Sequence, residues 1–255
     1  MTAPLAGRAA VVIGGSSGIG RALALGLAEA GADVAPSARR ADRVESVALE
    51  VEARGRRALR QPSDVHDRAS LERLLAAARE AFGKVDILVN CAGKTGRVPS
   101  LDMTEAHWDD LMDTNLTGTL RACQVFGRHM VERGYGRIIN IASLGSFAAL
   151  YEVAAYNTSK AGVVALTQSL AIEWARFGVC VNAIAPGVFR TDLNTALLDG
   201  TPRGQELLMR TPMRRFGKVE ELQGAAVFLA SEAASFVTGS TLVVDGGFLA
   251  SAVNQ

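Results

Sequence analysis

Short apolar runs alternate with longer stretches of helical period through most of this chain, and this alternation constrains the fold more than any other feature. Six apolar runs are predicted strands: Arg8–Ile13, Asp33–Ser37, Val85–Asn90, Arg137–Ala142, Val179–Ala185 and Thr241–Val244. Six other stretches are predicted helices: Ile19–Ala30, Asp42–Arg54, Asp67–Phe82, Glu105–Glu132, Ala155–Phe177 and Val219–Leu229. Such alternation favours βαβ crossovers and a parallel sheet with helices on both faces. The expected fold is α/β, a doubly wound sheet that binds ligands beyond the carboxyl ends of its strands.

The chain is expected to form a single domain over residues 1–255. No internal repeat or Ser/Gly-rich linker divides it, and its 255 residues, 49% of them hydrophobic, suffice for one α/β core. The composition shifts at about 188–215, where two glycines and two prolines lie between helical patches. This pattern predicts a loop-helix excursion that acts as a substrate lid, although a surface connection without a role has the same composition.

Charge and cysteine content exclude several classes of partner. The chain has 27 basic and 26 acidic residues, so no excess positive charge is available for nucleic acid or an anionic membrane. No apolar stretch approaches the ~18 residues of a membrane span, and the N-terminal apolar run is too short for a secretory signal. The separated Cys91, Cys123 and Cys180 predict neither a disulfide framework nor a metal site. We expect a cytoplasmic protein with a small-molecule partner.

A glycine-rich turn follows the first predicted strand and opens the first predicted helix. Its candidate ligand-binding residues are Gly14, Ser16, Ser17, Gly18, Ile19 and Gly20. Glycine lets the backbone approach a ligand closely, and a helix N-terminus offers free N–H groups to a pyrophosphate. The turn therefore predicts a dinucleotide site, although glycine serves any strand-to-helix turn.

Arg39 and Arg40 follow the second predicted strand, where a dinucleotide site carries an acid for the ribose 2′-hydroxyl or an arginine for a 2′-phosphate. Because guanidinium pairs bidentately with phosphate, the sequence favours NADP(H), with NAD(H) as the alternative cofactor. Both arginines could instead be solvated charges at a helix start. Asp64, with Val65 beside it, is a candidate acceptor for the adenine amino group.

Tyr156 and Lys160 lie four residues apart on a predicted helix, so their side chains share one face. Ser143 follows the fourth predicted strand. A free phenol titrates near ~10, and lowering its pKa to ~7 requires roughly 4 kcal/mol of preference for phenolate. A nearby ammonium can supply much of this, so Lys160 is predicted to lower the pKa of Tyr156. Ser143 is predicted to hydrogen-bond a substrate oxygen on which negative charge develops.

In combination these motifs resemble the short-chain dehydrogenase/reductase family. The matching segments are Gly14–Gly20, Asn90–Gly93, Asn115, Ser143, Tyr156–Lys160, Pro186–Gly187 and Thr191. They span nearly the whole chain and imply a Rossmann fold. The resemblance implies that Tyr156 is the general acid/base and that Lys160 lowers its pKa and binds the nicotinamide ribose. It further implies that Ser143 positions the carbonyl and that Asn115 holds a water in the proton relay.

The resemblance also implies cofactor contacts at the ends of two further strands. These residues are Asn90, Ala92, Gly93, Pro186, Gly187, Val188 and Thr191, with Thr191 on a phosphate. Two positions depart from the family pattern: Ile13 replaces a threonine, and Cys91 replaces the second asparagine of the NNAG motif. We expect altered packing there without loss of chemistry.

Residues near Ser143 and after Pro186 are expected to line the substrate pocket. They are Ser143, Gly145, Phe147, Tyr151, Glu152, Val153 and Phe189. Tyr151 and Glu152 suit a hydroxylated substrate, and the C-terminal segments resemble the branch of gluconate 5-dehydrogenases and related sugar dehydrogenases. A sugar, sugar acid or similar polyol is therefore expected. Whether Arg210, Arg214 or Arg215 anchors a substrate carboxylate stays open.

Two other functions remain alternatives. A 3-oxoacyl-thioester (acyl carrier protein) reductase would favour a basic surface beside the cleft. A non-catalytic dinucleotide-binding sensor or structural protein would need none of Ser143, Tyr156 and Lys160. The family resemblance also implies a homotetramer or homodimer. Its interfaces would use the predicted helices 105–132 and 155–177 and, separately, the C-terminal helix and strand.

Overall fold

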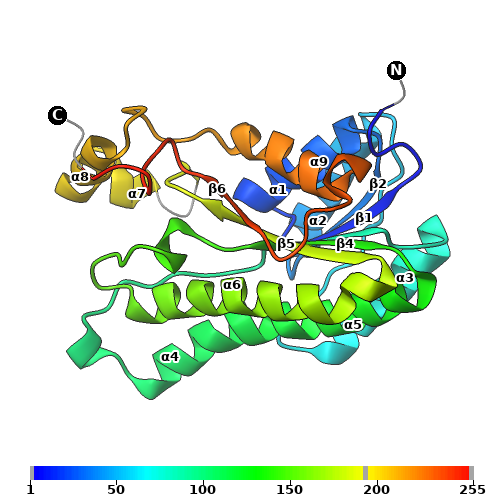
Figure 1. Ribbon diagram of the computed structural model, residues 1–255, viewed down its shortest axis with the longest axis horizontal. Helices are drawn as coiled ribbons and strands as arrows, with labels where there is room; N and C mark the ends of the chain where they lie inside the picture. Colours follow the sequence, from blue (N-terminus) through cyan, green and yellow to red (C-terminus); the bar gives the residue numbers. More distant parts are fainter. Residues whose placement is uncertain (1–2, 192–194, 253–255) are drawn as a thin grey trace.

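A parallel sheet of six strands forms the centre of the computed structural model, which describes residues 3–191 and 195–252 (Figure 1). The strands are β1 (Ala9–Ile13), β2 (Asp33–Ser37), β3 (Ile87–Asn90), β4 (Gly136–Ile141), β5 (Val179–Pro186) and β6 (Thr241–Val244), in the spatial order β2-β1-β3-β4-β5-β6. Strands β1 to β4 are buried along their whole length, as their nearly continuous apolar sequences require. The predicted doubly wound α/β fold is confirmed.

Helices cover both faces of this sheet (Figure 1). They are α1 (Gly18–Glu29), α2 (Ala41–Glu52), α3 (Arg68–Phe82), α4 (Glu105–Met112), α5 (Gly118–Arg133), α6 (Ala154–Trp174), α7 (Thr195–Leu198), α8 (Pro202–Arg210) and α9 (Gln223–Ala230). One apolar layer joins α1, α2 and α9 to the sheet through Leu23, Val47 and Leu229. The other joins α3, α5 and α6 through residues such as Leu71 and Phe126. No helix within the described ranges is long and apolar enough to cross a bilayer.

The carboxyl ends of four neighbouring strands are in register. Ile13 pairs with Ser37 of β2 and with Asn90 of β3, and Asn90 pairs in turn with Asn140 of β4. The direction in which the chain adds strands reverses between β1 and β3, and such a switch point is where doubly wound sheets bind ligands. The segments that follow these strands therefore meet at one edge of the sheet.

Two predicted helices differ in detail from the structure. The predicted helix Glu105–Glu132 is α4 and α5 joined by a π-helical turn, Asp113–Thr117, which the periodic apolar pattern does not reveal. The predicted helix Val219–Leu229 begins as a 3-10 turn, Val219–Leu222, before α9.

The excursion at 188–215 contains α7 and α8, at one end of the molecule (Figure 1). Thr201 caps α8 by accepting a hydrogen bond from the Gly204 N–H, and Pro202 occupies the first turn. The described part of the excursion is thus partly helical, and its role as a substrate lid stays a prediction.

Candidate active site

The glycine-rich turn is tied to both strands that neighbour β1. The N–H groups of Gly14 and Gly15 donate to the Ser37 carbonyl at 2.7 and 3.1 Å. Gly14 has φ +83°, and a Cβ there would lie 2.5 Å from the Ala92 nitrogen. Only glycine fits such an approach. The turn therefore packs directly against the segment that follows β3.

Helix α1 begins inside this turn and presents its N-terminus there. The Ser17 side chain makes no capping hydrogen bond, and the first turn of α1 carries no acidic residue. A Cβ on Gly18 would lie 3.4 Å from the Thr191 methyl carbon, which places Thr191 over the turn. Main-chain N–H groups, a helix dipole and a nearby hydroxyl are the donor set that a pyrophosphate needs. The residues present fit a dinucleotide cofactor.

Arg39 and Arg40 lie at the adjacent end of β2, where both side chains are exposed. Within residues 3–191 and 195–252, no ion pair engages either guanidinium. Ser63 lies beside β2, because its N–H donates to the Ala38 carbonyl at 3.1 Å. The next residue, Asp64, accepts from the His66 N–H through its carboxylate at 3.0 Å. The arrangement leaves cationic groups free for a ribose phosphate.

Ser143, Tyr156 and Lys160 come together beyond the end of β4. Ser143 caps a 3-10 turn and accepts from the Gly145 N–H at 3.0 Å, and it also shares a hydrogen bond with Tyr156. Lys160 is buried, donates to the Ile141 carbonyl at 2.7 Å, and has its Nζ 5.9 Å from the centroid of the Tyr156 ring. The structure thus assembles hydroxyl, phenol and ammonium at the edge that carries the glycine turn.

Burial controls the protonation of the phenol and the ammonium. It raises the pKa of Tyr156, and the hydrogen bond with Ser143 offsets only part of this rise. The shift of the Tyr156 pKa is opposite to the predicted one. The free energy needed to remove a phenolate from water is larger than the stabilisation that the neighbouring groups give it. Burial also lowers the pKa of Lys160 to about 8, against a smaller opposing effect of Cys91. At neutral pH the phenol keeps its proton and Lys160 is largely cationic.

The π-helical turn brings Asn115 into this centre. Its Oδ1 accepts from the Lys94 N–H at 2.9 Å, and its Nδ2 donates to the Lys94 carbonyl at 2.9 Å and to Ser159 Oγ at 3.0 Å. The amide therefore fastens the segment after β3 to α6. A Cβ on Gly93 would lie 3.3 Å from Asn115 Oδ1 and 3.5 Å from Lys160 Nζ, so Gly93 permits the approach. The implied role of holding a water stays a prediction.

Asn90 and Cys91 differ in their surroundings. Asn90 Nδ2 donates to Asn140 Oδ1 at 2.9 Å, so its side chain joins β3 to β4 inside the sheet. Cys91 is partly buried and interacts electrostatically with Lys160. Burial raises the pKa of the Cys91 thiol to about 11, which keeps it neutral and supports the expectation of a packing role.

The turn before α6 carries an ion pair that the sequence did not reveal. Glu152 has a left-handed backbone, with φ +61°, and its carbonyl accepts from the Val98 N–H at 2.8 Å. Its carboxylate pairs with Arg97 Nε at 2.6 Å, and the Arg97 guanidinium lies 5.8 Å from the centroid of the Tyr151 ring. Phe147 and Tyr151 are exposed and Val153 is buried. Arg97 thus contacts two of the residues that are predicted to line the substrate pocket.

The segment after β5 packs on the C-terminal part of the chain. The Gly187 N–H donates to the Val244 carbonyl at 2.8 Å, and the Val188 carbonyl accepts from the Gly217 N–H at 2.9 Å. The Phe189 ring is buried against Gly217. Val188 and Phe189 line a cavity of about 250 Å³. The Phe189 side chain therefore packs inside the protein and holds the start of the excursion against Gly217.

Two of the three candidate anchor arginines, near the C-terminal end of the excursion, have carboxylate partners. Arg210 pairs with Glu206 at 3.1 Å, and Arg215 pairs with Glu221 at 2.6 Å. Both pairs are exposed to water, where an ion pair contributes little, so whether Arg210 or Arg215 anchors a substrate carboxylate stays open.

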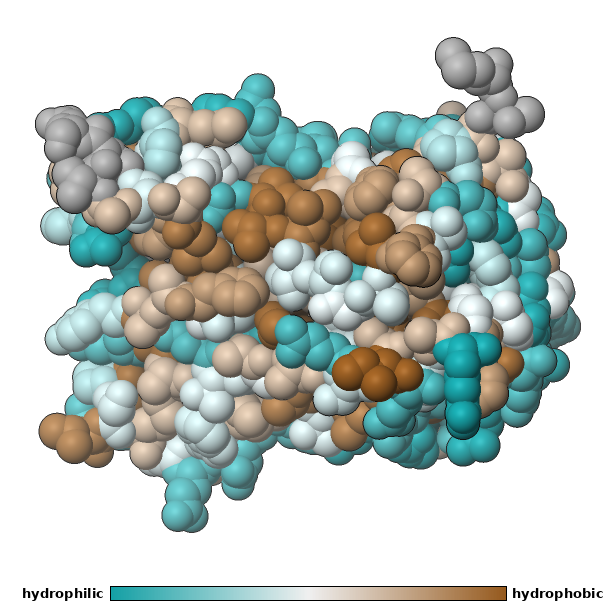
Figure 2. All heavy atoms as spheres, viewed as in Figure 1, coloured by the Kyte–Doolittle hydropathy of each residue, from teal (hydrophilic) through white to brown (hydrophobic). Residues whose placement is uncertain are grey.

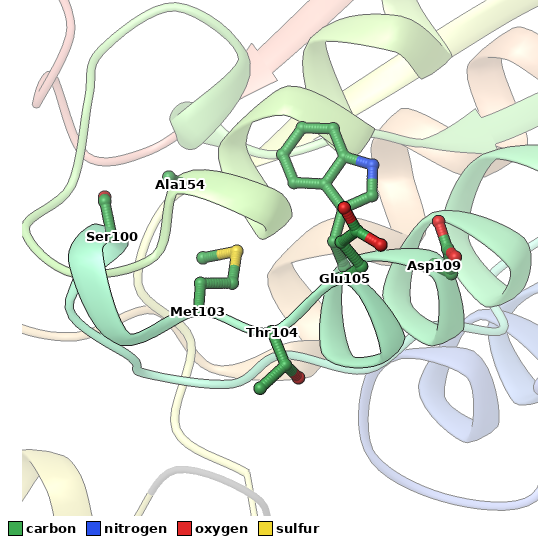
Figure 3. Close-up of a pocket in the computed structure, with 7 residues that line it drawn as sticks. Ser100, Met103, Thr104, Glu105, Asp109 and Ala154 are labelled. Carbon is green, nitrogen blue, oxygen red and sulfur yellow. The ribbon is translucent and has the colours of Figure 1, made fainter.

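A larger cavity, of about 560 Å³, lies at the start of α4 (Figure 3). It is lined by Ser100, Met103, Thr104, Glu105, Trp108, Asp109 and Ala154. None of the predicted catalytic, cofactor or substrate residues lines it. Cavity size therefore does not single out the edge of the sheet at which Ser143, Tyr156 and Lys160 meet.

Comparison with known proteins gives matches over nearly the whole chain. A family model described as enoyl-(acyl carrier protein) reductase matches residues 13–249. The gluconate 5-dehydrogenase of Gluconobacter oxydans strain 621H is 42% identical over 247 residues, covering 97% of this chain and 96% of that protein. The D-threitol dehydrogenase of Mycolicibacterium smegmatis is 41% identical over 246 residues, covering 96% and 94%. A structure of gluconate 5-dehydrogenase from Burkholderia cenocepacia J2315 with NADP and tartrate has a TM-score of 0.94 and 40% identity, covering 98% of both chains.

Proposed function

The chain belongs to the short-chain dehydrogenase/reductase family, and we propose that it is an NADP(H)-dependent oxidoreductase that interconverts a secondary alcohol and a ketone. The proposed substrates are sugars, sugar acids or similar polyols. The observation that carries the proposal is the group of Ser143, Tyr156 and Lys160, with Ser143 and Lys160 buried, at the sheet edge that also carries the glycine turn. Relatives named for gluconate and threitol support the substrate class.

The proposed chemistry assigns one task to each side chain. A nicotinamide cofactor, when bound, supplies or accepts the hydride. Tyr156 gives its phenolic proton to the carbonyl oxygen during reduction and takes a proton from the alcohol during oxidation. Ser143 donates a hydrogen bond to that oxygen, and Lys160 stabilises the phenolate that reduction leaves. The raised pKa of Tyr156 keeps the proton on the phenol until transfer.

The cofactor assignment rests on two parts of the site. The N–H groups at the start of α1 and the Thr191 hydroxyl would hold the pyrophosphate. Arg39 and Arg40 would hold a 2′-phosphate, which favours NADP(H) over NAD(H). The relative from Burkholderia cenocepacia has NADP in its structure.

We also propose a homotetramer. Apolar side chains gather over α9 and β6 on the face shown in Figure 2, where Phe228, Leu242 and Val243 are partly exposed. An exposed apolar edge strand is typical of a subunit interface. Light scattering should give four times the mass of the chain, and a monomer would contradict this proposal. We further propose the cytoplasmic location that the sequence analysis expects.

A survey of substrates tests the proposed activity. The purified protein should oxidise NADPH in the presence of a reactive diketone and of a keto sugar or keto sugar acid. Acetoacetyl thioesters should be poor substrates, because the arginines Arg210 and Arg215 are paired and offer little basic surface to an acidic carrier protein. Failure to oxidise NADPH with any of these carbonyl compounds would overturn the proposal.

A further inference from the structure

We infer that His66 is a positioning residue: it holds the π-helical turn that carries Asn115 against the loop 63–66, which is attached to the end of β2. The inference rests on the proposed function and deepens it, because the predicted part of Asn115 in proton transfer requires its amide to keep its place. The chemistry proposed above assigns no task to His66. The structure nevertheless joins its ring to the turn at two points.

Both nitrogens of the His66 ring contact the π-helical turn. Nδ1 lies 3.0 Å from Asp113 Oδ2, and because an ionised carboxylate only accepts, this nitrogen is the donor. Nε2 shares a hydrogen bond of 2.9 Å with Thr114 Oγ1. Asp113 and Thr114 directly precede Asn115 in the same turn. One side chain thus holds two successive residues beside Asn115.

The π-helical turn needs contacts of this kind. Its Gly118 N–H donates to the Asp113 carbonyl, five residues back, and such a ladder is rare within helices. The Thr114 hydroxyl donates to the Asp110 carbonyl at 2.9 Å, which is a bond within the same helical segment. Bonds within the segment do not fix the turn relative to the sheet. Its position therefore depends on contacts with other parts of the chain.

The loop 63–66 gives His66 a fixed base. The Ser63 N–H donates to the Ala38 carbonyl at 3.1 Å, and the hydroxyls of Ser63 and Ser37 share a hydrogen bond of 2.8 Å. The Ser37 carbonyl in turn accepts from the Gly14 N–H at 2.7 Å. None of these bonds uses the imidazole, so we expect the loop to keep its place when His66 is replaced.

On its other side the turn reaches the proposed catalytic group. Asn115 is fully buried and donates from Nδ2 to Ser159 Oγ at 3.0 Å. Gly93 lies against both Asn115 Oδ1 and Lys160 Nζ. A shift of the turn would move this amide relative to α6, and a displacement of about 1 Å at a reaction site can cost as much as ~100-fold in rate. The contacts of His66 thus bear on the reaction through Asn115.

Arg121 of α5 reinforces the same contact. Its Nη2 donates to Asp113 Oδ1 at 2.7 Å, and its Nη1 donates to the Val65 carbonyl at 3.2 Å. Val65 also packs on Gly118, where a Cβ would lie 2.9 Å from Val65 Cβ. Because these contacts stay when His66 is replaced, we expect the turn to loosen rather than to detach.

Hydrogen exchange of the free protein tests the contact without any substrate. His66→Leu removes both ring nitrogens and should speed amide exchange in residues 113–119 about fivefold or more, while exchange in α9 stays unchanged. Thr114→Val removes the hydroxyl from the other side of the contact and should act in the same direction, so the test stands if His66→Leu does not fold. Exchange equal to that of the wild type would overturn the inference.

Diketone reduction with NADPH tests the effect on the reaction. In His66→Leu, kcat should fall about tenfold, while KM for the diketone and the affinity for NADPH are retained. Arg73→Met is the matched control, because it removes an exposed ion pair with Asp67, next to the same loop, that does not touch the turn. An unchanged kcat in His66→Leu, or an equal loss in the control, would overturn the inference.

A double-mutant cycle tests whether His66 acts through Asn115. In an Asn115→Ala background, His66→Leu should change kcat by less than about twofold, because the amide that it positions is gone. Ser159→Ala takes the place of Asn115→Ala if that variant does not fold, since it removes the acceptor of the Asn115 amide. Losses that simply multiply would overturn the inference.

The two kinds of measurement separate this inference from the proposed function. If the wild type reduces no carbonyl compound, the proposed function fails, and the exchange rates still decide whether His66 holds the turn. If the wild type reduces the diketone and His66→Leu does so equally fast, only the inference fails.

Discussion

The proposed cofactor end and the proposed substrate end of this site are built by different means. At the cofactor end, Gly14 and Gly93 let main-chain segments approach to distances at which a side chain would collide. At the substrate end, Glu152 and Arg97 meet through an ion pair between loops that lie more than fifty residues apart in the sequence. Steric contacts leave little room for variation, whereas charged loops can change partners. The comparison explains how a family can keep its cofactor site and vary its substrates.

The largest effect is expected from adding one methyl group at the cofactor end. Gly14→Ala places a Cβ 2.5 Å from the Ala92 nitrogen at φ +83°. The substitution should lower the free energy of unfolding by about 3 kcal/mol or more, as measured by urea denaturation. Gly224→Ala, on α9 with open space around it, is the control and should be neutral or stabilise by about 0.5–1 kcal/mol. Equal effects of the two changes would contradict the steric account.

A second test addresses the buried ammonium that lies between the two ends. Burial lowers the pKa of Lys160 from 10.5 to about 8, so between these values the unfolded chain binds more protons than the folded protein. Lys160 should therefore make the free energy of unfolding rise between pH 8 and 9.5, by at most about 2 kcal/mol. Burial raises the pKa of the Cys91 and Cys123 thiols, which lowers stability over the same range, so the lysine is read from the difference between the wild type and Lys160→Met. This difference should grow between pH 8 and 9.5, whereas the difference between the wild type and Lys218→Met should stay constant. A constant difference for Lys160→Met would show that burial does not lower the pKa of Lys160.

The raised pKa of Tyr156 sets the upper limit of that pH range. The folded protein retains the phenolic proton above pH 10 longer than the unfolded chain does, so stability falls with pH there. Measurements up to pH 9.5 therefore separate the lysine from the phenol.

The preference between NADPH and NADH gives a further test. It depends on a charged side chain at the cofactor end, where the contacts described above are steric. Arg39→Ala should reduce the ratio of kcat/KM for NADPH to that for NADH by about tenfold or more. Arg43→Ala, on the exposed side of α2, is the matched control and should leave the ratio unchanged. A full preference for NADPH in Arg39→Ala would place recognition of the 2′-phosphate elsewhere.

The smallest effect is expected from an ion pair far from both ends. Glu52 pairs with Arg60 at 2.7 Å on the surface, where water screens the interaction. Glu52→Gln should leave the urea midpoint and kcat/KM unchanged within error. A clear loss of activity would show that surface ion pairs in this protein act at long range.

Periodic and local features were predictable from the sequence. The parallel sheet followed from the alternation of apolar runs and helices, and the glycine turn and the spacing of Tyr156 and Lys160 located the centre of the site. These features depend on neighbouring residues, which one sequence displays.

Features set by distant contacts were not predictable. The π-helical turn at Asn115 depends on hydrogen bonds with Lys94 and Ser159, and no local pattern encodes them. The pairing of Arg97 with Glu152 depends on a turn with positive φ at a non-glycine residue. The upward pKa shift of Tyr156 depends on burial, which the spacing of Tyr156 and Lys160 does not report.

Proton transfer from Tyr156 is the central claim, and the rate of diketone reduction by Tyr156→Phe tests it most directly. The variant keeps the ring and its packing but loses the hydroxyl that Ser143 contacts. NADPH binding, followed by fluorescence titration, should be retained, while kcat/KM falls by about 10³-fold. Rates equal to those of the wild type, with the same affinity for NADPH, would contradict the account.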